Sequence, residues 1–181
     1  MRDLKPYIKK YEKCFYEKYE KPFREELIPI GQRALYKGYF NRYEFKKIYK
    51  WKASRALKNL EKNEEKIINN TRKALAETDI TQKLKCLLDI RGVRAAVASA
   101  VLTVIDPVKF GIIDKYAWKA LRREKLVKTR TFDSGKAKKR GIQNYVEYLE
   151  ILRRLKENQR IQTAHDVDKA LMMYGKDLGL T

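Results

Sequence analysis

The stretch from residue 84 to residue 105 limits the possible folds more than any other part of the chain. An apolar run at positions 84–90 precedes Gly92, and small and branched residues fill positions 95–105. Glycine permits a positive φ or a close approach of another backbone, so a tight turn can join two helices here. The amide groups at the start of the second helix would then attract an anion. This stretch therefore predicts a hairpin of two helices with an anion-binding end.

Apolar residues recur at helical spacing over most of the remaining chain. Tyr7, Tyr11, Phe15 and Tyr19 predict an amphipathic helix that ends at Pro22. Further helices are expected at 23–37, 44–60, 61–75, 115–121, 145–155 and 167–174.

Residues 122–140 have few apolar side chains and predict a basic loop. We find no alternating strand and no internal repeat. The fold class is therefore predicted to be all-α. We expect one compact helical domain over residues 1–181, or two closely packed helical halves, with the hairpin motif at 84–105.

The charge of the chain favours a polyanionic partner. Lys and Arg number 43 against 23 Asp and Glu, which gives a formal charge of +20 spread along the chain. A thermophile surface is the alternative, but it alone predicts balanced signs. No segment approaches the roughly 20 apolar residues that a membrane span needs, and no signal peptide opens the chain. We expect no membrane partner, no evident protein partner and a cytoplasmic location.

The chain has few residues that could bind a metal. Cys14 and Cys86 are too few for an iron–sulfur cluster with four thiolates, and we expect both to be reduced. The lone His165 cannot form a zinc site by itself. No cofactor and no metal are therefore expected.

The hairpin stretch resembles the helix-hairpin-helix motif of the DNA glycosylase superfamily. Ile90, Gly92, Val93, Ala98 and Leu102 match its pattern, and the match covers about 35 of the 181 residues. The family places an aspartate 22 residues after the first hairpin glycine, where this chain has Asp114. The resemblance implies a DNA-binding protein of base-excision repair.

Two residues depart from the family pattern. Arg94 stands where the family has its second hairpin glycine, and an arginine there could itself contact a phosphate. Ala96 stands where bifunctional members carry the lysine that forms a Schiff base. Since alanine cannot form an imine, the resemblance implies either a monofunctional, hydrolytic glycosylase or a member that has lost its chemistry.

Asp114 is the candidate catalytic residue. The resemblance assigns it the role of stabilising positive charge on the sugar as the base leaves, or of activating water. The alternative is an ordinary N-cap of the following helix, and one aspartate can play both roles. The target nucleotide would be flipped out of the duplex into a pocket.

The remaining candidates are expected to contact DNA or the flipped base. Trp51 and Lys52 follow a pattern that several superfamily members show before their hairpin, which makes them weaker candidates for a base pocket, and packing in the core is the alternative for Trp51. The candidates for DNA binding are Gly92, Val93, Arg94, Lys115, Lys119 and Arg122. For the basic cluster after Asp114, a solvated helix face is the alternative.

Three functions remain open from the sequence. The favoured one is a monofunctional DNA glycosylase that removes a damaged or mismatched base. The second is a catalytically silent protein that binds duplex DNA through the same hairpin. The third is a basic helical protein associated with RNA or the ribosome, which the charge favours but the spacing from Gly92 to Asp114 does not.

Overall fold

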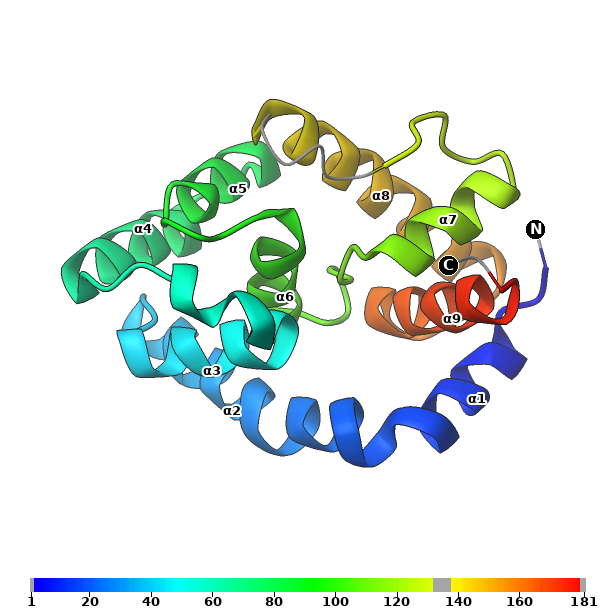
Figure 1. Ribbon diagram of the computed structural model, residues 1–181, viewed down its shortest axis with the longest axis horizontal. Coiled ribbons are helices and arrows are strands. Elements are labelled where there is room, and N and C mark those ends of the chain that lie inside the picture. The colour runs from blue at the N-terminus through cyan, green and yellow to red at the C-terminus, as the bar shows by residue number, and fades with distance from the viewer. Residues whose placement is uncertain (1, 132–137, 180–181) are drawn as a thin grey trace.

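A computed structural model describes residues 2–131 and 138–179 of the protein, and these residues contain helices but no β-strand, as predicted (Figure 1). The α-helices are α1 (Lys5–Phe15), α2 (Ile28–Lys37), α3 (Arg42–Ala53), α4 (Glu64–Ala76), α5 (Ile80–Leu88), α6 (Ala95–Ile105), α7 (Lys115–Arg123), α8 (Lys138–Asn158) and α9 (Ala164–Asp177). Shorter π-helical segments lie at Tyr16–Glu20 and Phe23–Leu27, and a 3₁₀ helix lies at Ser54–Asn59.

Helix α6 forms the centre of the fold. Residues 97–104 are all buried, so this helix has no solvent-facing side over that length. A helix that is apolar all round needs neighbours on every side. Helices α2, α3, α5 and α8 provide these contacts. Gly31 allows α2 to come close to α6, because a Cβ at this position would lie 2.2 Å from the carbonyl oxygen of Val104.

The chain from residue 5 to residue 37 is helical almost without interruption, which corrects the prediction that Pro22 ends the first helix. Pro22 has helical dihedral angles, φ −58° and ψ −35°, and lies between the two π-helical segments. The amide of Lys21 bonds to the carbonyl of Tyr16, five residues back. These wider turns let the chain continue without the amide hydrogen that proline lacks.

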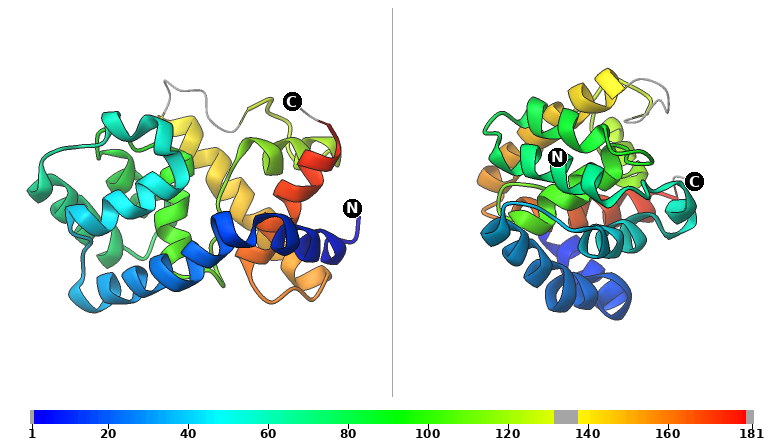
Figure 2. Two further views of the ribbon diagram at one scale, coloured as in Figure 1. Left: turned by 60° about the horizontal axis from the view of Figure 1, so that its bottom comes forward. Right: turned by 90° about the vertical axis from the view of Figure 1, so that its left-hand side faces the viewer.

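Helix α1 lies beside α9, although the two are far apart in sequence (Figures 1 and 2). The backbone amide of Leu4 donates to Oε1 of Gln159 at 2.8 Å, which fixes the start of α1 near the end of α8. Helix α9 also packs closely on α7, where a Cβ at Gly175 would lie 2.1 Å from the carbonyl oxygen of Tyr116. Helices α1, α7 and α9 thus pack together, and α2 carries the chain to the helices around α6.

Several predicted boundaries differ from the structure; the helix expected at 145–155, for example, is Lys138–Asn158. The helix expected at 44–60 is α-helical only to Ala53 and then tightens into the 3₁₀ helix. Lys138, Lys139 and Arg140 were assigned to the basic loop but form the first turn of α8, because Lys and Arg are good helix formers. The middle of that expected loop, 132–137, lies outside the described residues. No helix in the described parts of the chain is long and apolar enough to cross a membrane.

Candidate functional site

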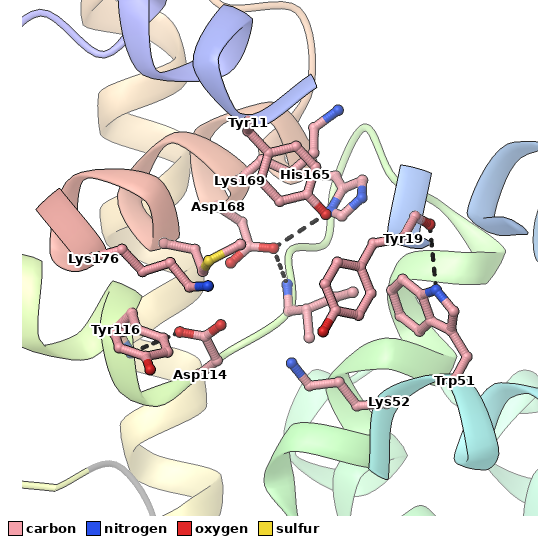
Figure 3. A pocket seen from close by; sticks show the side chains of 12 residues that line it. Tyr11, Tyr19, Trp51, Lys52, Asp114, Tyr116, His165, Asp168, Lys169 and Lys176 are labelled. Carbon is pink, nitrogen blue, oxygen red and sulfur yellow. Dashed lines mark hydrogen bonds and ion pairs between the residues drawn. The ribbon is translucent and has the colours of Figure 1, made fainter. Parts of the chain in front are cut away.

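A pocket of about 180 Å³ lies where the N-terminal helical stretch, the end of α3, the start of α7 and α9 meet (Figure 3). Aromatic, acidic and basic side chains share its wall. Its lining consists of Tyr11, Tyr19, Trp51, Lys52, Ile112, Asp114, Tyr116, His165, Asp168, Lys169, Met172 and Lys176. The structure therefore brings three predicted site residues, Trp51, Lys52 and Asp114, to one pocket.

Asp114 both caps a helix and lines the pocket. Its Oδ1 accepts hydrogen bonds from the amides of Tyr116 and Ala117 at 2.8 and 2.9 Å, so it is the N-cap of α7. Burial raises the pKa of this carboxyl above its usual value, and the nearby Asp168 carboxylate adds to the rise. Lys52 and the two amides oppose this rise. Figure 3 shows the Lys52 amine and the Asp114 carboxylate facing each other across the pocket.

Aromatic rings form one side of the pocket. The Trp51 indole is half-buried, and its Nε1 donates to the carbonyl of Tyr19 at 3.3 Å. The rings of Tyr19 and Trp51 meet edge to face, with centroids 6.4 Å apart, and Phe23 lies 5.6 Å behind Trp51. Trp51 therefore packs on the core, which was the alternative to a role in a base pocket, and it also lines the pocket.

Helix α9 supplies a buried polar cluster to the wall of the pocket. Asp168 accepts hydrogen bonds from the hydroxyl of Tyr148 at 2.7 Å and from the amide of Ile112 at 3.0 Å. Nδ1 of His165 lies 3.3 Å from the same carboxylate. Lys169 forms ion pairs with Glu20 at 3.1 Å and with Asp166 at 2.8 Å.

None of these α9 residues was identified from the sequence. The signal that could have revealed them is the presence of His165, Asp168 and Lys169 at helical spacing beside the apolar residues of the same helix. Polar residues on a buried face need partners, so such a cluster indicates either a structural network or a site.

The turn between α5 and α6 depends on Gly92. This residue has φ +86°, and a Cβ on it would lie 2.4 Å from the carbonyl oxygen of Asn59. The carbonyl of Gly92 accepts a hydrogen bond from the Tyr49 hydroxyl at 3.1 Å, and the carbonyl of Arg91 accepts one from the amide of Glu61 at 3.0 Å. The close approach that requires glycine is therefore to the protein's own backbone.

The start of α6 is basic, and the side chain of its N-cap residue, Arg94, makes no capping hydrogen bond. Arg94 has an extended backbone, φ −119° and ψ 173°, so the absence of a glycine at this position causes no strain. The side chains of Arg91 and Arg94 are exposed, whereas Val93 is buried. Val93 could therefore contact a ligand only through its backbone.

The predicted cations of α7 lie away from this turn (Figure 1). Lys115 and Arg122 are exposed, and Lys119 is half-buried. The Lys115 amine lies 4.7 Å from the centroid of the Tyr116 ring, beside the pocket. The predicted site residues therefore form two groups. One group lies at the pocket and on α7, and the other lies at the turn around Gly92.

Among the described residues, no group of three or more His, Cys, Asp or Glu side chains is placed to hold a metal ion. Cys14 is exposed, Cys86 is half-buried, and neither forms a disulfide. Comparison of the chain with protein-family models, with curated proteins and with solved structures finds no match.

Proposed function

We propose that the protein binds duplex DNA and hydrolyses the N-glycosidic bond of a damaged or mismatched base, with Asp114 as the essential carboxylate. The observation that carries this proposal is the position of Asp114 in a pocket lined by aromatic side chains. The resemblance of residues 90–102 to the helix-hairpin-helix glycosylases and the net charge of +20 support it.

The chemistry follows from the charge that develops during cleavage. Positive charge appears at C1′ as the bond to the base breaks, and a carboxylate held in place beforehand stabilises it. The amides of Tyr116 and Ala117 hold Oδ1 of Asp114 in this way. With alanine at position 96, we assign the attack to water: it adds to C1′ as the bond from C1′ to the base breaks, its proton passes to Asp114, whose pKa is raised by burial, and the departing base takes up a proton.

The aromatic side of the pocket suits a flipped base. Tyr19 and Trp51 present rings on which a planar base can stack, and such stacking offsets part of the few kcal/mol needed to flip a nucleotide. The start of α6 and the exposed Arg91 and Arg94 suit DNA phosphates. Base and backbone would thus be bound at separate places on the molecule.

A panel of duplexes, each with one lesion or mismatch, tests this proposal. The duplexes are incubated with the protein and treated with alkali, which cuts the strand wherever a base has been released. We expect release from at least one duplex and no cut without alkali. Release from none, together with tight duplex binding, would favour the catalytically silent binder. Preference for structured RNA over duplex DNA would favour an RNA-associated protein.

A further inference from the structure

A basic groove adjoins the pocket and shares Tyr19, Trp51 and Lys52 with it. We call it the α3 groove. Its lining comes from the π-helical segments and Pro22 between them, from α3 and from the first residues of the 3₁₀ helix. The described residues that line it are Lys18, Tyr19, Pro22, Glu26, Leu27, Lys47, Lys50, Trp51, Lys52, Ala53, Ser54, Arg55 and Ala56.

The charges in the α3 groove are strongly unequal. Its described lining contains four lysines and one arginine but one acidic residue, Glu26. Glu26 lies 3.6 Å from the Lys47 amine and so balances that cation. Lys50 and Arg55 are exposed, and Lys52 is half-buried at the border with the pocket. A concave surface with this imbalance attracts an anion, and its shape concentrates the field.

The position of the groove indicates which anion fits. A base that enters the pocket remains joined to its sugar, and the sugar is joined to a phosphate on either side. These phosphates must lie outside the pocket, within one nucleotide of its mouth. Trp51 and Lys52 line both spaces. A cationic groove next to aromatic side chains is typical of proteins that follow a nucleic-acid backbone.

We propose that the α3 groove binds the phosphodiester backbone of the strand that supplies the flipped base, directly beside the target nucleotide. This inference rests on the proposed function, because it assumes that a nucleotide enters the pocket. It adds a second backbone contact, from α3, to the one expected at the start of α6. Neither Lys50 nor Arg55 belongs to the hairpin motif from which DNA binding was predicted.

The test compares two lysine variants that change the charge equally. Lys50→Gln alters the groove, and Lys73→Gln alters an exposed lysine on α4 that does not line it. Binding to a labelled duplex with one tetrahydrofuran abasic-site analogue is measured by fluorescence anisotropy over a range of salt concentrations. Each phosphate contact contributes about 0.9 to the slope of log affinity against log salt. We expect Lys50→Gln to lower this slope by about 0.9 and Lys73→Gln to leave it unchanged.

Duplexes with uncharged linkages locate the contact. A methylphosphonate replaces one phosphate at a time on either side of the abasic analogue. We expect a methylphosphonate at one position within two nucleotides of the analogue to lower the affinity of the wild type and of Lys73→Gln. The same substitution should leave the affinity of Lys50→Gln unchanged, because that variant already lacks the contact. Equal slopes for Lys50→Gln and the wild type, or equal sensitivity to every linkage, would overturn the proposal while leaving the glycosylase function intact. If the wild type shows no salt-dependent binding to duplex DNA, the proposed function fails first and this inference fails with it.

Discussion

The N-cap residues of α6 and α7 were both predicted to be site residues, but they carry opposite charge. Arg94 is the N-cap of α6, lies near the exposed Arg91 and makes no capping hydrogen bond through its side chain. Asp114 is the N-cap of α7, and its carboxylate accepts from two amides of that helix. The start of α6 therefore combines the positive end of a helix dipole with two cations, whereas at the start of α7 a carboxylate offsets that dipole and lines the pocket.

Under the proposed function, this difference separates binding from chemistry. A basic helix end suits a phosphate, and a carboxylate at a helix end suits a sugar that becomes positively charged. If the proposed function holds, substitutions at α6 should change affinity, and substitutions at Asp114 should change the rate of base release. Each experiment below tests one side of this comparison.

The largest effect is expected from Asp114→Asn. Asparagine caps helices as well as aspartate does, so this variant removes the charge and keeps the cap. We expect base release to fall by at least about 100-fold, because the group that stabilises the transition state is lost. Burial raises the pKa of Asp114, which means that folding disfavours its ionised form, so the melting temperature at neutral pH should stay equal or rise. DNA affinity should also stay equal or rise.

Asp79→Asn is the matched control for this experiment. Asp79 caps α5 by accepting from the amide of Gln82 at 2.9 Å, and it is exposed and does not line the pocket. We expect unchanged base release in this variant. Unchanged release in Asp114→Asn as well would reduce Asp114 to a helix cap.

Gly92→Ala should give the next largest effect, on stability. The positive φ and the overlap with the Asn59 carbonyl together should cost about 2–4 kcal/mol of the free energy of unfolding. Urea denaturation measures this loss. Gly38→Ala is the control, because Gly38 also has a positive φ, +78°, but a Cβ there meets nothing within 4 Å. Equal losses in the two variants would show that the contact with Asn59 contributes nothing.

Arg94→Gln tests the start of α6 as a phosphate site. We expect the slope of log affinity against log salt to fall by about 0.9 for duplex DNA, with no change in the rate of base release at saturating protein. Arg153→Gln, an exposed arginine on α8, provides the same change of charge elsewhere. If both variants shift the slope alike, the effect is one of net charge and the α6 end is not a site.

The smallest effect is expected from Lys52→Met. Base release needs the ionised form of Asp114, so the rate should fall as pH drops through the raised pKa of this group, above the value of about 3.9 for an ordinary aspartate. Lys52 opposes the rise in that pKa, so its removal should move the acid limb to higher pH. Single-turnover rates across pH measure the shift. An unmoved limb would mean that Lys52 does not affect the ionisation of Asp114.

The helical class and most helix positions could be predicted from local sequence, because apolar spacing and caps such as Asp79 act over a few residues. The continuation of the helix through Pro22 could not be predicted, because it depends on π-helical turns that have no recognisable residue pattern. Asp114 was predicted from the family resemblance, which places an aspartate 22 residues after Gly92, and it lines the pocket. His165, Asp168 and Lys169 were missed because their place at the pocket depends on how α9 packs against distant segments.

The packing of α1 on α9 has a consequence for how the protein is made. A ribosome produces the chain from the N-terminus, so α1 emerges well before its partner α9. The helices around α6 lie between the two in sequence and can assemble first, whereas the aromatic face of α1 is covered only after α9 has been made. Tyr11 and Tyr19 therefore meet the α9 wall of the pocket late in the folding of these residues.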